Sequence, residues 1–161
     1  MEAVEMPLLE HKQFIHAPIE VCFDVARGFG IHPQTPLKGT GKTVGGLTEG
    51  LPGEGDCVTW ECVNFGIKQR ITSRIIFMEK PHSFVEKMVK GPFKTFIYIH
   101  QFIEEEKGTT MIDHIQYHLW LGPIGVLMDK WFLAKYFKKI IVTRSIELKE
   151  AAEKKTNQTF D

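Results

Sequence analysis

The feature that most constrains the fold is a long segment near the C-terminus that contains no helix-breaking residue. Gly122, Pro123 and Gly125 end the segment before it, and no glycine or proline follows them. This spacing predicts one helix from about Gly122 to Glu153. Mostly apolar side chains recur along it every three or four residues: Leu127, Trp131, Ala134, Phe137, Ile141, Ser145, Leu148 and Ala152. Such a stripe has to pack against another element, and the preceding chain indicates a sheet.

The middle of the chain alternates apolar and polar residues with the two-residue period of strands that bury one face. One predicted hairpin turns around Gly66. A two-residue turn there would place Trp60 opposite Ser73. The same register would place Val58 opposite Ile75, so that the apolar side chains share one face of the sheet.

The last predicted hairpin carries a histidine and an aspartate among its inward-facing residues. A polar turn around Glu106 and Lys107 joins its two strands. Pairing outward from this turn gives three opposed pairs on the inward face: Tyr98 with Ile115, His100 with Asp113, and Phe102 with Met111. We therefore expect His100 and Asp113 to face each other on the side of the sheet that meets the long helix.

The N-terminal part predicts a strand over residues 11–16 and a helix over 19–28, because Ala17-Pro18 ends the one and presets the first turn of the other. A short second helix or turn should follow through Ile31. The glycine-rich stretch 38–55 predicts an edge strand or loop that could act as a lid. The predicted fold is α+β, a curved antiparallel sheet of about six or seven strands around a long C-terminal helix, with one or two short helices after the first strand.

Length and charge set the remaining bounds. A chain of 161 residues, 43% of them apolar, fits one domain over 1–161, with a core of about 11–153. Lysine plus arginine equal aspartate plus glutamate at 20 each, so no overall field favours nucleic acid. Three cysteines without a C-x-x-C pair suit a reducing compartment, and the composition of the first residues leads us to expect no signal sequence there. We expect a cytoplasmic protein.

Several short segments resemble one superfamily. The start of the chain at residues 14–23 (FIHAPIEVCF) is similar to the opening of START-like proteins, also called SRPBCC or helix-grip proteins. Three further segments carry the same resemblance: 55–60 (GDCVTW), 65–69 (FGIKQ) and 121–125 (LGPIG). Together they resemble a bacterial subgroup of uncharacterised proteins, some labelled cell-division inhibitors. The superfamily includes lipid carriers, plant hormone receptors, polyketide cyclases, quinone-binding proteins and the catalytic domains of ring-hydroxylating oxygenases.

The resemblance implies an internal cavity between the concave face of the sheet and the long helix. The inward positions of the predicted strands and the helix stripe supply its lining: Trp60, Ser73, Phe77, Phe84, Glu86, Met88, Phe96, Tyr98, His100, Phe102, Met111, Asp113, Ile115, Tyr117, Leu127 and Trp131. For each residue alone, ordinary core packing is the competing interpretation. Collectively they favour an apolar pocket with a few polar groups.

His100 and Asp113 allow two interpretations. A histidine and a carboxylate that face each other in a pocket could act as acid and base, as in cyclase members of the superfamily, with Tyr98 or Tyr117 moving protons. The alternative is a buried hydrogen-bonded pair that fixes the strand register.

Metal and cofactor sites find no support in the sequence. His114 and His118 would lie on the outer face of a strand, roughly 13 Å apart, which is too far for one ion. His11, His16, His32 and His82 fall in or beside predicted loops and are interpreted as surface residues. We expect no cofactor. The aromatic and basic residues at 131–139 would allow transient membrane contact, against the simpler interpretation of a solvated helix face.

The leading hypothesis is a binder or carrier of a small apolar or aromatic molecule, such as a lipid, an isoprenoid, a quinone or a polyketide-like compound. An enzyme of the cyclase or dehydratase type that uses His100 and Asp113 is the first alternative. A structural or partner-binding domain with a vestigial cavity is the second. The oligomeric state stays open.

Overall fold

The computed structural model describes residues 8–28, 42–47, 50–64, 67–120 and 132–159. Their helices and strands follow one another in this order: β1 Leu8–Ile15, α1 Ile19–Arg27, β2 Lys42–Gly46, β3 Cys57–Asn64, β4 Ile67–Glu79, β5 Ser83–Lys90, β6 Thr95–Glu105, β7 Gly108–His118 and α3 Ala134–Thr159. The predicted short second helix, the start of the predicted long helix and much of the predicted lid lie outside the described residues.

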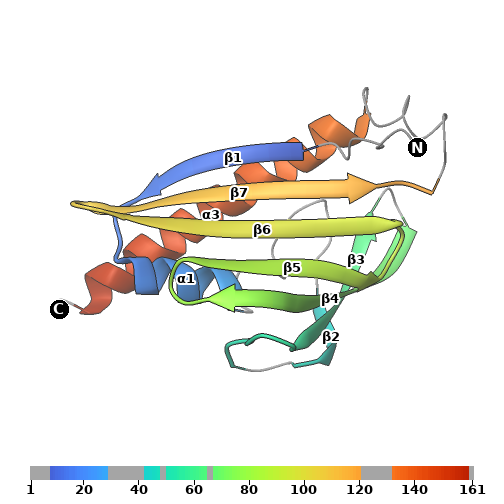
Figure 1. Ribbon diagram of the computed structural model, residues 1–161, viewed down its shortest axis with the longest axis horizontal. Helices are drawn as coiled ribbons and strands as arrows, with labels where there is room; N and C mark the ends of the chain where they lie inside the picture. The colour runs from blue at the N-terminus through green and yellow to red at the C-terminus, as the bar shows by residue number, and fades with distance from the viewer. Residues whose placement is uncertain (1–7, 29–41, 48–49, 65–66, 121–131, 160–161) are drawn as a thin grey trace.

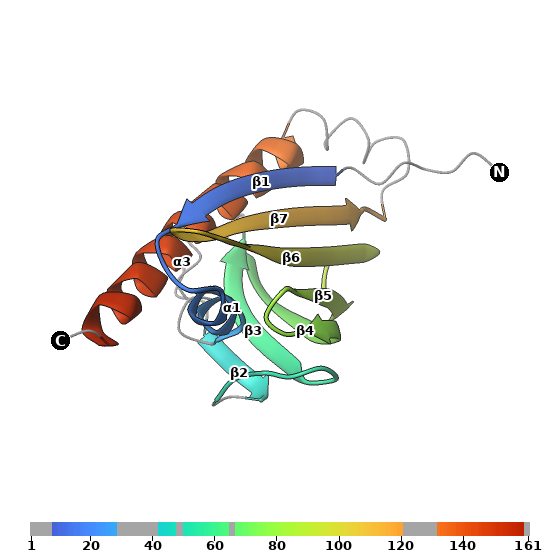
Figure 2. The same cartoon turned by 60° about the vertical axis from the view of Figure 1, so that its left-hand side comes forward.

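The strands form one sheet of seven strands in the order β1-β7-β6-β5-β4-β3-β2, and every neighbouring pair is antiparallel. The sheet curves, and α3 runs across it beside β1 (Figure 1). The short helix α1 lies against α3, β6 and β7 (Figure 2). One buried cluster joins residues of α1, α3 and the inward face of the sheet, so both helices cover the same face. The predicted helix-grip arrangement is confirmed.

Helix α1 follows from its local sequence. Pro18 precedes it with φ −58°, and the Gly28 N–H donates to the Asp24 carbonyl at 3.0 Å where the helix ends. Its buried face consists mainly of Ile19, Cys22, Phe23 and Ala26. The predicted helix over 19–28 is therefore confirmed to within one residue.

The stripe of α3 packs as its spacing predicts. Phe137, Ile141, Ser145, Leu148 and Ala152 are buried. Leu127 and Trp131, the first two members of the stripe, lie outside the described residues. The helix continues to Thr159 instead of ending near Glu153.

The same helix protects the β1 edge of the sheet. The Lys138 ammonium donates to the Glu10 carbonyl at 2.8 Å, and the Glu153 carboxylate accepts from the His16 N–H at 2.9 Å. Both backbone groups belong to β1 or its end, where an unpaired edge would invite another strand. Side chains of α3 therefore occupy two backbone groups at this edge that could otherwise pair with another strand.

The two predicted hairpins differ in accuracy. In β6 and β7 the pairs Tyr98 with Ile115, His100 with Asp113, and Phe102 with Met111 form as predicted. In β3 and β4 the register was wrong by two residues, because pairing extends to Asn64 and Ile67. Trp60 therefore lies opposite Ile71, and Val58 opposite Ser73. A shift of two residues keeps every side chain on its predicted face.

Phe77 is the lining residue whose predicted direction was wrong. A register shift between Ile75 and Phe77 interrupts the pairing of β4 with β5. The extra residue reverses the alternation beyond it, as a β-bulge does. Phe77 is therefore 46% exposed, and Met78 packs against the core in its place.

The contribution of α3 packing to stability can be measured by comparing two isoleucines of this helix. Ile141 is fully buried, whereas Ile146 is 48% exposed. We expect Ile141→Ala to lower the free energy of unfolding by about 2–5 kcal/mol and Ile146→Ala by less than about 1 kcal/mol. Urea denaturation of both variants measures the difference. Equal losses would contradict the packing described for α3.

Candidate functional site

The centre of the candidate site is a hydrogen bond between His100 of β6 and Asp113 of β7. His100 Nδ1 lies 2.8 Å from Asp113 Oδ1, and both side chains are 2% exposed. The two residues are opposite one another in the antiparallel ladder, so the backbone itself brings the side chains together. A carboxylate can only accept a hydrogen bond, so with Asp113 ionised His100 Nδ1 is the donor.

This pair lies between two apolar clusters. The pair Phe102 and Met111 on one side belongs to the cluster that includes α1 and the end of α3. The pair Tyr98 and Ile115 on the other side belongs to a second cluster around Phe137 and Ile141. The polar pair thus has apolar neighbours along both strands, and among these four residues only Tyr98 carries a polar group, its hydroxyl.

The other nitrogen of His100 is the most unusual atom of the site. His100 Nε2 is buried and has no hydrogen-bond partner among the described residues. The nearest acidic group is the Glu86 carboxylate of β5, whose Oε1 lies 3.8 Å away, beyond hydrogen-bond length. Aromatic rings hold the imidazole in place, because Phe84 stacks on it with ring centroids 4.4 Å apart and Tyr98 lies at 4.0 Å.

Arg144 of α3 brings a positive charge to this cluster. Its guanidinium carbon lies 4.8 Å from the centroid of the Tyr98 ring, a cation–π distance. Burial raises the pKa of the Tyr98 hydroxyl well above its usual value, and the negative charge of Asp113 adds to this rise while Arg144 opposes it. Tyr98 is therefore a neutral hydroxyl, able to donate and to accept a hydrogen bond.

Two members of this cluster were missed by sequence reasoning. Arg144 lies three residues beyond the buried Ile141 and therefore on the same side of α3. A cation at this helical spacing was the sequence signal that could have identified it. His11 was predicted to be a surface residue, but it pairs with Asp113 across β1 and β7, and its Nε2 is buried without a partner among the described residues. Burial, with the positive charge of Lys138, lowers the pKa of His11.

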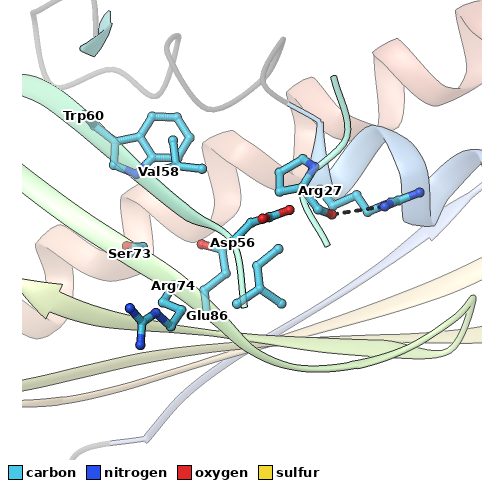
Figure 3. Close-up of a pocket in the computed structure, with 9 residues that line it drawn as sticks. Arg27, Asp56, Val58, Trp60, Ser73, Arg74 and Glu86 are labelled. Carbon is cyan, nitrogen blue, oxygen red and sulfur yellow. Dashed lines mark hydrogen bonds between the residues drawn. The ribbon is translucent and has the colours of Figure 1, made fainter. Parts of the chain in front are cut away.

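A small pocket adjoins Glu86 (Figure 3). Its other walls come from α1, the loop before β3, and strands β3 and β4: Arg27, Pro52, Asp56, Val58, Trp60, Ser73, Arg74 and Ile75. Arg27 is buried and donates to the Pro52 carbonyl at 3.0 Å, which fastens the loop to α1. The volume is about 10 Å³, roughly the space of one water molecule.

The remaining predicted lining residues fall into clear groups. Most are buried on the inward face: Phe84, Met88, Tyr98, His100, Phe102, Met111, Asp113, Ile115 and Tyr117. Trp60, Ser73, Glu86 and Phe96 are half-buried. Leu127 and Trp131 lie outside the described residues. The role of the whole set in ligand binding stays a prediction.

The described part of the chain gives little basis for metal binding, for a cysteine nucleophile or for a membrane-spanning helix. Within it, no three histidine, cysteine, aspartate or glutamate side chains gather as metal ligands. Cys22 is buried, and burial raises its pKa to about 11, which makes it a poor nucleophile. None of the described helices has the length and apolarity needed to cross a membrane.

Known proteins resemble the chain in structure. Neither a protein-family model nor a curated protein matches it. The TTHA0849 protein of Thermus thermophilus is 20% identical, with TM-score 0.68 over 91% of this chain and 97% of its own. A START superfamily protein from Mycobacterium smegmatis is 12% identical, with TM-score 0.64 over 94% and 98%. The KanY protein is 14% identical, with TM-score 0.69 over 93% and 99%.

At these identities the likeness establishes the fold alone. The fold is the START-like, or SRPBCC-like, helix grip that the sequence segments indicated. The label of cell-division inhibitor stays a prediction, since none of these three proteins carries it.

The raised pKa of Tyr98 predicts a loss of stability at high pH. Above the ordinary tyrosine pKa of about 10 the unfolded chain releases this proton while the folded chain keeps it, so the free energy of unfolding falls as pH rises. Tyr98→Phe removes this contribution and should flatten the decline by up to about 1.4 kcal/mol per pH unit. Urea denaturation from pH 9 to 11 measures both slopes. Identical slopes would show that Tyr98 titrates normally.

Proposed function

We propose that this START-like protein binds a small apolar or aromatic molecule between its sheet and its helices, with a polar end of that molecule at His100. The observation that carries the proposal is the buried Nε2 of His100, which has no hydrogen-bond partner in the described part of the chain and lies between two clusters rich in aromatic side chains. Apolar walls with a few placed polar groups are typical of small-molecule sites. The lipid, isoprenoid, quinone or polyketide-like compounds expected from the sequence all have such a mixed character.

The unsatisfied nitrogen of His100 carries an energetic cost. A buried polar atom without a hydrogen bond costs about 1–3 kcal/mol, and native proteins keep few of them. His100 cannot turn away, because Asp113 holds Nδ1 and Phe84 stacks on the ring. A ligand group or a water molecule that hydrogen-bonds to Nε2 would remove this cost.

Binding requires the interior to open. The pocket beside Glu86 has a volume of about 10 Å³, whereas ligand sites typically span roughly 300–1,000 Å³. Side chains that line it would have to move to admit a molecule. Trp60 and Ser73 are half-buried there and are the natural ones to yield.

A catalytic role is the second candidate, and one observation favours it. A carboxylate on Nδ1 fixes the tautomer and orientation of the imidazole and leaves Nε2 as the proton acceptor, which is the arrangement of a general base. Tyr98, with its neutral hydroxyl and its ring centroid 4.0 Å from that of the imidazole, could then serve as a donor. Proton transfer within a bound substrate would use these groups without a cofactor.

Binding is tested on the purified protein. We expect native mass spectrometry or solvent extraction to yield an apolar compound, and the neutral fluorescent probe N-phenyl-1-naphthylamine to bind with an increase in its emission. His82→Gln changes an exposed histidine and should leave probe binding unchanged. Absence of both a co-purified compound and probe binding would contradict the proposal.

Catalysis is tested on the compound that extraction identifies. If the protein converts it, His100→Gln should lower the rate at saturating compound by about 10²- to 10⁴-fold, the usual contribution of a general base. A protein that returns the compound unchanged, with or without this substitution, is a binder.

A further inference from the structure

The geometry points to a ligand whose polar end is a neutral hydroxyl group, with Glu86 as the residue that rejects carboxylates. This inference rests on the proposed function and narrows it to one class of compound: phenols or long-chain and polycyclic alcohols, as opposed to fatty or aromatic acids. Four features of the described residues support it.

The first feature is the pair of atoms that a ligand would meet. His100 Nδ1 donates to Asp113, so in the neutral ring Nε2 presents a lone pair. Glu86 Oε1, 3.8 Å from that nitrogen, is a second acceptor. A group placed between two acceptors has to donate, which a hydroxyl does and a carboxylate cannot.

The second feature is that Glu86 disfavours a ligand carboxylate whether or not His100 is protonated. If the ring is protonated, Nε2 becomes a donor whose nearest acidic partner is Glu86, already in place at 3.8 Å. A ligand carboxylate would then compete with a fixed carboxylate of the protein for the same proton. In either state the incoming anion meets Glu86.

The third feature is the balance of charge around the nitrogen. Two acidic side chains approach the imidazole, Asp113 at 2.8 Å and Glu86 at 3.8 Å. Arg144 of α3 lies over the Tyr98 ring, and Arg27, which lines the pocket beside Glu86, is held in an ion pair with Asp24 at 2.6 Å. With Asp113 and Glu86 ionised, a further carboxylate brought to this nitrogen would be repelled by both, and charges in a protein interior interact more strongly than in water.

The fourth feature is space and surroundings. The pocket that Glu86 lines, to which His100 contributes no wall, has room for a group of about the size of one water molecule, which a hydroxyl matches and a carboxylate, with its two oxygens, exceeds. Phe84 and Tyr98 flank the imidazole, so the rest of the ligand meets aromatic surfaces. A hydroxyl on an apolar body fits both requirements.

The test compares matched probes by isothermal titration calorimetry at pH 7: 2-naphthol against 2-naphthoate, and 1-dodecanol against dodecanoate. We expect the alcohol of at least one pair to bind at least tenfold more tightly than its acid. Glu86→Gln keeps the shape and removes the charge, so it should reduce that ratio to threefold or less, mainly by tighter binding of the acid. Glu104→Gln, an exposed glutamate on β6, serves as the matched control and should leave the ratio unchanged.

The outcomes separate this inference from the proposed function. Binding of a carboxylate as tight as, or tighter than, its alcohol would overturn the inference and leave the proposal of an apolar ligand intact. An unchanged ratio in Glu86→Gln would overturn the role of Glu86. If no probe of either pair binds and N-phenyl-1-naphthylamine also fails to bind, the proposed function itself is contradicted, and the inference fails with it.

Discussion

The hydrogen bond between Asp113 and His100 is the interaction on which the interior depends. Both side chains are almost completely removed from water, and neither could remain there without the other except at a cost of several kcal/mol. Their pairing therefore requires β6 and β7 to adopt one register. A slip of one residue would turn the inward apolar side chains of the slipped strand toward water.

Once this register is set, the apolar rows on either side follow. Phe102 and Met111 join the cluster beneath α1, and Tyr98 and Ile115 join the one beneath the first turns of α3. Helix α3 reaches both clusters with a single stripe, from Phe137 to Ala152. It also supplies Arg144 above Tyr98, so the helix that closes the core also contributes the cation of the polar cluster. A core built this way retains a polar centre that a purely apolar one would lack, and we relate that centre to ligand binding.

Much of this arrangement could be predicted from the sequence. The stripe of α3 and the pairing of His100 with Asp113 follow from periodicity and from a short polar turn, both of which are local signals. The register of β3 and β4 was wrong by two residues because the alternation is the same in either pairing, and only the position of the turn distinguishes them. The direction of the Phe77 side chain was predicted wrongly because the alternating sequence contains no signal for the β-bulge that precedes it. His11 was missed because the neighbours of β1 depend on a strand about a hundred residues away. Arg144 was overlooked because the stripe was defined by apolar and small residues.

The most direct test of the central claim is the nuclear magnetic resonance of the His100 imidazole in protein labelled with ¹⁵N at histidine. We predict a proton on Nδ1 that exchanges slowly with solvent, because Asp113 and the surrounding rings shield it. We also predict an Nε2 signal that shifts when a bound compound reaches it. A Nδ1 proton that exchanges as fast as that of the exposed His82, or an Nε2 signal that stays unchanged when a compound binds in the interior, would contradict this claim.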